Sequence, residues 1–197
     1  MQASFLFASL DGSLPQGYHY PYEVMTMKEL LDLVDRHGKP LNLTIVKGDP
    51  VPQDTYWRVC DAWFVDAQGR LLLQKRADAH LRFPGMWCCT GGAVRSGETP
   101  AQGCIRECQE ELGLTPDMNR GDMVMEFCAS HSYHYIWLFR HNIPPEALRL
   151  QPGEVSQARW FTVEEVRGLI RRGEFVPLGY TEQLLMMLPI LSVCGKE

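Results

Sequence analysis

The sequence lacks the features that mark membrane, exported and disulfide-rich proteins. It has no run of about 18 apolar residues, so we expect no membrane-spanning helix. Its first ten residues carry no cationic side chain and Asp11 follows at once, so we expect no signal peptide and a cytoplasmic location. The seven cysteines lack the clean C-x2-C pairs of a zinc site. We therefore interpret them as reduced thiols that pack as small hydrophobic side chains.

An excess of basic residues is also missing. The chain has 19 Lys and Arg against 24 Asp and Glu, a formal net charge of −5. This balance argues against a protein that binds nucleic-acid backbones in general, since such binding needs a basic surface. The 197 residues show no internal repeat and suffice for one domain with a sizeable core and terminal additions.

The most informative stretch is residues 92–114, a glycine-rich loop followed by a short helix. Thr99 is a good N-cap, Pro100 suits the first helical position, and Gln102 completes a capping box. Gly113 provides the residue in left-handed conformation that commonly ends a helix. The stretch therefore predicts a helix of about three turns.

Two faces of this helix differ in character. Glu107, Glu110 and Glu111 follow the i, i+3, i+4 spacing that puts three carboxylates on one side. These charges repel one another, and Mg²⁺ would relieve the repulsion because it prefers hard oxygen ligands. A pair between Glu98 in the loop and Arg106 would fix the loop on the helix. The apolar face, which we expect to pack in a core, comprises Ala101, Cys104, Ile105, Cys108 and Leu112.

A lone E-x-x-E-E pattern is most often a solvated acidic face, but here the whole stretch resembles the Nudix box, G-x5-E-x7-R-E-U-x-E-E-x-G-U with U apolar. It matches from Gly92 to Leu114, with Cys108 where a bulkier aliphatic residue is usual. The resemblance implies an α/β fold, a Nudix-type α/β/α sandwich with a mixed central sheet. It further implies metal ligation by Glu107, Glu110, Glu111 and the carbonyl of Gly91. By the same resemblance Glu98 and Arg106 hold the frame, and one glutamate takes a proton from water.

The rest of the chain divides into three parts. We expect an N-terminal extension over residues 1–27, a Nudix domain over 28–180, and a helix over 181–197 that covers the core or a dimer seam. Residues 26–38 fit either a capped helix or, with residues 31–34 and 41–46, a hairpin. We favour the hairpin, because Nudix proteins related to isopentenyl diphosphate isomerase open in this way. Strands are predicted at 55–65, 70–76, 88–90, 123–129, 133–140 and 158–161, and a helix at 162–172.

Further candidate site residues lie outside the acidic helix. Lys75 and Arg76 end a strand close to the loop that enters the box, so they are either phosphate contacts or solvated edge charges. Gly92, with Gly91, lets the backbone approach a substrate closely. Glu154 precedes a strand at the position where some Nudix hydrolases keep a further metal ligand or general base, although a loop glutamate is more often solvated.

Two histidines have no such support. His131 and His134 lie in and just before a predicted strand, where histidines are most often packed or surface groups. No third ligand stands at a spacing suited to a metal. We therefore leave them out of the predicted site.

The resemblance predicts a Mg²⁺-dependent hydrolase, with Mn²⁺ as a substitute, that cleaves a nucleoside diphosphate derivative or similar organic pyrophosphate. The partner expected is a small-molecule diphosphate, and the apolar terminal segments favour a homodimer. Two alternatives stay open, a non-catalytic Nudix-fold ligand sensor and an isomerase of isopentenyl diphosphate. The isomerase keeps a catalytic Cys and a His-Pro pair where, aligned on Trp87, this chain has Gly92 and residues 94–95. The cysteines at 88–89 fall about three residues too early for that role.

Overall fold

A computed structural model describes residues 28–78 and 82–193, with side chains described as far as Pro189. The predicted extension over residues 1–27 lies outside the described residues. Nine strands form one mixed sheet, because β3 and β8 are parallel while the other pairings are antiparallel. The strands are β1(Leu30–Val34), β2(Pro40–Val46), β3(Tyr56–Val65), β4(Leu71–Arg76), β5(Trp87–Cys88), β6(Thr90–Ala93), β7(Gly121–Ala129), β8(Ser132–Arg140) and β9(Val155–Phe161).

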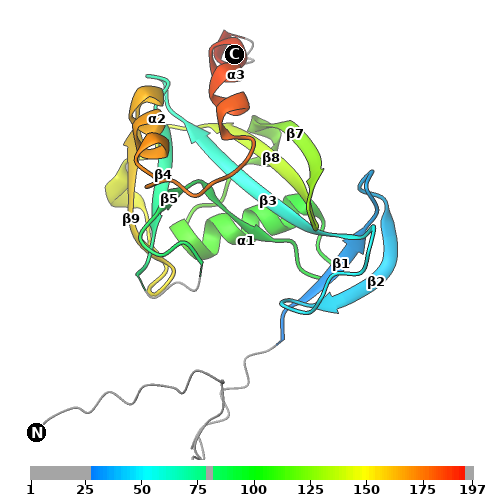
Figure 1. Cartoon of the computed structure of the whole chain (residues 1–197). Coiled ribbons are helices and arrows are strands. Elements are labelled where there is room, and N and C mark those ends of the chain that lie inside the picture. The colour runs from blue at the N-terminus through cyan, green and yellow to red at the C-terminus, as the bar shows by residue number, and fades with distance from the viewer. Residues whose placement is uncertain (1–27, 79–81, 194–197) are drawn as a thin grey trace, which may run out of the picture.

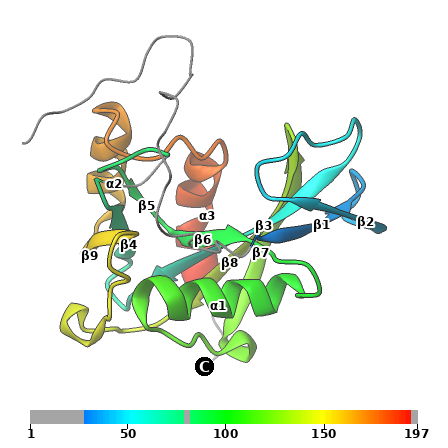
Figure 2. The ribbon, with the colours of Figure 1, turned by 90° about the horizontal axis from the view of Figure 1, so that it is seen from below.

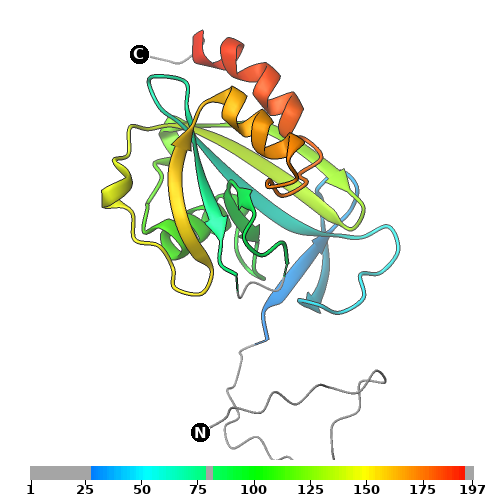
Figure 3. The same cartoon turned by 60° about the vertical axis from the view of Figure 1, so that its left-hand side comes forward.

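Helices cover both faces of this sheet. One face carries α1(Pro100–Leu112), and the other carries α2(Val163–Arg171) and α3(Thr181–Val193) (Figures 1 and 2). The helices α2 and α3 lie side by side (Figure 3), joined by an ion pair of 2.9 Å between Arg167 and Glu182. Two short 3-10 helices, Met118–Arg120 and Pro145–Ala147, complete the regular structure. The predicted α/β/α sandwich with a mixed sheet is confirmed.

The central strands are buried on both faces, which explains their unbroken apolar character. Alternate residues of β3 point to opposite layers, and β8 follows the same rule with its aromatic residues. The core beneath α1 includes Cys60, Ala62, Phe64, Trp137 and Phe139. The core beneath α2 and α3 includes Trp63, Val65, Ile136, Leu138, Leu184, Leu185 and Leu188.

The N-terminal segment is the hairpin, and the alternative helix over 26–38 is wrong for its described part. Strands β1 and β2 pair across a turn in which the Asp35 carboxylate accepts from the backbone N–H groups of His37 and Lys39. The hairpin contacts the loop before α1 through a hydrogen bond of 2.7 Å that Ser96 N donates to the Leu30 carbonyl. It therefore lies beside the loop that leads into α1 (Figure 1).

Two local predictions need correction. The single strand expected at 88–90 is two strands, because β5 pairs with β4 whereas β6 pairs with β3, and the chain changes partner at Cys89. The cysteines are buried as expected, except that Cys128 is exposed and Cys194 lies outside the described residues.

Over residues 28–78 and 82–193, no helix has the length and apolar character needed to cross a bilayer.

Candidate active site

The acidic helix α1 begins and ends as its sequence predicts. Thr99 Oγ1 accepts from Gln102 N over 3.2 Å, and Gln102 Oε1 accepts from Thr99 N over 2.8 Å, which closes the capping box. Gly113 ends the helix with φ of 68°. Cys104 and Cys108 are buried in the core below. Since that face is fixed, Glu107 and Glu111 on the adjoining face point toward β6, where they meet Gly92 and Gly91.

Arg106 connects the loop before α1, strand β6 and helix α1 through hydrogen bonds. Its Nε donates to Glu98 Oε1 over 2.7 Å and its Nη2 to the Ala93 carbonyl over 2.7 Å. Its Nη1 reaches Glu107 over 2.6 Å and Glu110 over 3.1 Å. The predicted ion pair with Glu98 is present. Burial raises the pKa of Glu98, but hydrogen bonds from Arg106 and from the backbone of Arg95 outweigh it, so the net pKa lies below its usual value.

The remaining carboxylates are held in different environments. Glu111 is 8% exposed and accepts from Gln74 Nε2 over 2.8 Å and from Gly91 N over 3.2 Å. Burial, reinforced by the charge of Glu107, raises the pKa of Glu111 to about 8. Burial also raises the pKa of Glu107, although Arg106 acts in the opposite direction. The side chain of Glu110 is 37% exposed and stays accessible.

These carboxylates fit a hard divalent cation. Glu107, Glu110 and Glu111 line one cavity of about 390 Å³, together with Gly91 and Gly92. A cation there would offset the cost of burying charged carboxylates, which the raised pKa values reveal. Among the described residues, no three acidic, histidine or cysteine side chains converge on a common point. Mg²⁺ suits such an open arrangement, because it keeps several waters and takes few carboxylates plus substrate phosphates.

Two consecutive glycines, Gly91 and Gly92, line this cavity. A Cβ atom on Gly92 would lie 2.6 Å from Glu107 Oε1, and one on Gly91 would lie 2.3 Å from the Cys60 carbonyl oxygen. Neither distance is tolerable for a real side chain. The backbone of β6 therefore approaches Glu107 at Gly92, and β3 at Gly91, as closely as only glycine permits.

Comparison with known proteins decides the family. A family model described as the NUDIX domain matches residues 55–179. The chain belongs to the Nudix hydrolase family. The Nudix match begins after the N-terminal hairpin and includes the whole acidic helix.

Individual relatives agree with this assignment. A Nudix hydrolase of Listeria monocytogenes that is itself uncharacterised is 29% identical over 154 residues, covering 78% of this chain and 91% of that protein. A crystal structure from Deinococcus radiodurans superimposes with a TM-score of 0.66 and 26% identity, over 81% of this chain and 99% of the other. An isopentenyl-diphosphate Delta-isomerase of Streptomyces avermitilis is 36% identical over 92 residues, which cover 45% of this chain and 46% of that protein.

Replacing Gly92 of the Nudix box with Ala should damage the site directly. The added methyl group meets the Glu107 carboxylate, so either the carboxylate or β6 must move. We expect a loss in kcat/KM of about 10- to 100-fold, the size seen when groups that orient metal ligands are disturbed. Gly168→Ala in α2 is the matched control, since its methyl group meets only the flexible ends of Arg171 and Arg172 among the described residues. Equal activity of both variants would show that close approach at Gly92 is unimportant.

The hairpin outside the Nudix match also reaches the acidic cavity. Glu29 accepts from Lys47 Nζ over 2.5 Å and from Arg95 Nε over 3.0 Å. Arg95 Nη1 in turn donates to Glu110 over 3.2 Å. Sequence reasoning missed all three residues, because Arg95 occupies a variable position of the box and the hairpin is distant along the chain. Lys47 lines the same cavity as the three glutamates.

The structure separates the other predicted site residues. Arg76, Glu154 and Gly92 line the cavity with Glu107. Lys75 lines neither this cavity nor the adjoining cavity that Asp61 and Tyr180 line. Its charge instead helps to lower the pKa of Glu174. The reason is that the side chains of successive strand residues point to opposite faces of the sheet, so Lys75 and Arg76 do not lie on the same face. Lys75 is therefore not brought to the site.

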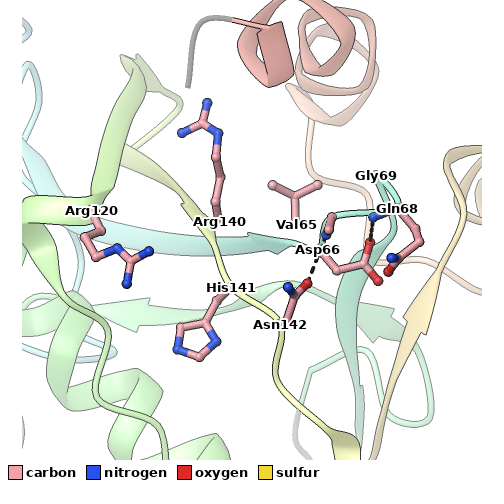
Figure 4. Close-up of a pocket in the computed structure, with 9 residues that line it drawn as sticks. Val65, Asp66, Gln68, Gly69, Arg120, Arg140, His141 and Asn142 are labelled. Atoms are coloured by element: carbon pink, nitrogen blue, oxygen red, sulfur yellow. Dashed lines mark hydrogen bonds between the residues drawn. The ribbon is translucent and has the colours of Figure 1, made fainter. Parts of the chain in front are cut away.

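A separate cavity of about 660 Å³ lies at the far end of β3 (Figure 4). Basic and imidazole groups surround it, from Arg120, Arg140 and His141. Its polar contacts serve the β3–β4 turn, where Asp66 accepts from Gln68 N over 2.9 Å and Asn142 Oδ1 accepts from Ala67 N over 3.0 Å. It carries no cluster of carboxylates, so we place the active site at the Nudix helix.

Proposed function

We propose that this Nudix hydrolase uses Mg²⁺, with Mn²⁺ as a substitute, to cleave the pyrophosphate linkage of a nucleoside diphosphate derivative or similar organic pyrophosphate. The observation that carries the proposal is the composition of one cavity. Its wall brings Glu107, Glu110 and Glu111 together with the cationic side chains of Lys47 and Arg76. The carboxylates suit metal and the cations suit phosphate oxygens, so both ends of a metal–diphosphate complex have ligands.

The residues would divide the work as follows. Glu107, Glu110, Glu111 and the Gly91 carbonyl would hold the metal, which when bound lowers the pKa of water and neutralises phosphate charge. Arg106 and Glu98 keep the loop in register with the helix. Glu107, Glu110 and Glu154 are the candidates to take the proton from water, since all three line the cavity.

Isomerase chemistry has less support. Cys88 and Cys89 are both 4% exposed, and burial raises the pKa of the Cys88 thiol to about 12. A thiol in this state forms little thiolate near neutral pH. The position aligned with the catalytic Cys is Gly92, which has no side chain. We therefore favour hydrolysis despite the partial similarity to the Streptomyces isomerase.

Location and assembly stay predictions. A cytoplasmic location remains a prediction, and we infer a homodimer from the apolar C-terminal segment. Helix α3 buries Leu184, Leu185 and Leu188 in the core while Met186 is 62% exposed. Sedimentation at several protein concentrations would distinguish monomer from dimer.

The test of the function is product release from a panel of nucleoside diphosphate sugars, dinucleotides, nucleoside triphosphates and isoprenoid diphosphates. Each compound is incubated with the protein in Mg²⁺ and in EDTA, and products are separated by chromatography. We expect cleavage of one class, in Mg²⁺ only. Tight binding of one compound without turnover would instead support the ligand-sensor alternative. Isomerised product would support the isomerase.

A further inference from the structure

A second cavity adjoins the acidic one. It has a volume of about 480 Å³ and shares Gly91, Gly92, Trp57 and Val59 with the cavity that Glu107 lines. The two glycines form the boundary, because their missing side chains would touch Asp61 on one side and Glu107 on the other. A compound whose diphosphate lies at the glutamates therefore has space for its remaining group in the second cavity.

A buried carboxylate with fixed partners forms part of the wall of this second cavity. Asp61 is 6% exposed, and its Oδ2 accepts from the hydroxyl of Tyr180 over 2.7 Å. The Tyr180 oxygen accepts from Trp63 Nε1 over 3.1 Å, which directs the hydroxyl proton toward Asp61. A carboxylate offers about four acceptor positions, so one hydrogen bond from Tyr180 leaves Asp61 with acceptor capacity.

His134 adds a second polar group beside Asp61. Its Nδ1 lies 3.8 Å from Asp61 Oδ2, is buried, and has no hydrogen-bond partner among the described residues. Its other ring nitrogen lies 2.8 Å from the Ser132 hydroxyl, and its ring stacks on Phe127 with centroids 5.0 Å apart. The stacking and the Ser132 contact hold the imidazole at the cavity edge.

Resting on the proposed function, we propose that this cavity binds the group attached to the diphosphate and that Asp61 selects a group bearing hydroxyl or amino donors. A sugar or nucleoside carries such donors, whereas an isoprenoid chain does not. An aliphatic chain would remove water from Asp61 and return no hydrogen bond, which is unfavourable for a buried polar group. Phe127 and Leu178, which also line the cavity, supply apolar contact for the faces of a ring.

The selection can be tested by substrate comparison in the Asp61→Asn variant. Asn keeps the shape and one carbonyl acceptor for Tyr180, but it loses the charge and gains an N–H₂ donor. The probes are UDP-glucose, ADP-glucose and ADP-ribose on one side and isopentenyl and geranyl diphosphate on the other. For the best nucleoside diphosphate sugar we expect KM to rise about 10- to 100-fold, with kcat changed far less.

Inorganic pyrophosphate provides the internal reference, because it occupies the diphosphate site and lacks any further group. Its inhibition constant should stay within about twofold of the wild-type value in Asp61→Asn. A matching rise for pyrophosphate would mean that the variant disturbs the whole site and would overturn the proposal. An unchanged KM for the sugar compound, or wild-type preference for the isoprenoid compounds, would overturn it too.

Two further measurements separate this inference from the proposed function. If the wild type turns over none of the compounds, calorimetric affinities in Mg²⁺ for the same probes still rank sugar against isoprenoid groups. A His134→Phe variant, which keeps the ring stacking on Phe127, serves if Asp61→Asn does not fold. This variant should bind nucleoside diphosphate sugars more weakly and bind pyrophosphate as the wild type does. Weaker binding of both would count against selection in this cavity.

Discussion

Glu110→Gln should lower kcat by about 10³-fold while the protein keeps its fold, the range reported for loss of one group that stabilises transition-state charge. The side chain is 37% exposed, and among the described residues its carboxylate pairs with Arg95 and Arg106. The amide keeps the size of the side chain but is a poor ligand for a hard cation. The rate loss should therefore come from the metal rather than from packing.

This prediction is checked by steady-state kinetics over a Mg²⁺ titration. Glu164→Gln is the charge-matched control, because Glu164 is an exposed residue of α2 that pairs only with Arg171 among the ion pairs of the described residues. The control should match the wild type at every Mg²⁺ concentration. If Glu110→Gln reached the wild-type kcat at saturating Mg²⁺, the residue would only tune metal affinity. If it matched the wild type throughout, Glu110 would have no part in the reaction.

Glu111→Gln should stabilise the metal-free protein and also abolish activity. The pKa of Glu111 is about 8 in the folded chain against 4.5 for an unperturbed glutamate. Between these values the folded state binds more protons than the unfolded state, so the free energy of unfolding falls as pH rises. Gln removes the buried charge and retains an acceptor for Gln74 Nε2 and Gly91 N.

We expect the free energy of unfolding of the variant to exceed that of the wild type by about 2–4 kcal/mol at pH 8, or roughly 5–10 °C in Tm. At pH 5 the difference should be small. Thermal unfolding in EDTA across this pH range measures the difference. Added Mg²⁺ should then raise the Tm of the wild type and not that of Glu111→Gln. A variant that is less stable than the wild type at pH 8 would show that the Glu111 carboxylate stabilises the metal-free fold, contrary to this prediction.

The sequence predicted the parts of the site that depend on local chemistry. The cap at Thr99, the terminating Gly113 and the pairing of Glu98 with Arg106 all follow from side chains within a few turns of one helix. The acidic face also follows, because i, i+3, i+4 spacing leaves no other arrangement. Such features need no knowledge of the sheet.

Contacts between distant segments could not be predicted in this way. Tyr180 and Asp61 are 119 residues apart, and Arg95 and Glu29 are 66 apart. No local pattern marks either pair. The position of Lys75 away from the cavity has a different reason, since the strand face that meets the cavity decides whether Lys75 or Arg76 lines it. That choice is fixed by the pairing of β4 with β5 and β9, which only the structure defines.

The central claim is that the carboxylates on α1 bind the divalent metal that the reaction uses. Isothermal calorimetry of Mn²⁺ or Mg²⁺ binding at about pH 7, where Glu111 is mostly protonated, with no substrate present, tests it most directly. The wild type should bind metal with release of protons, since buried Glu111 must ionise. The double variant Glu110→Gln with Glu111→Gln should bind at least 10-fold more weakly, and Glu164→Gln should match the wild type. Equal binding by the wild type and the double variant would contradict the claim and place the metal elsewhere.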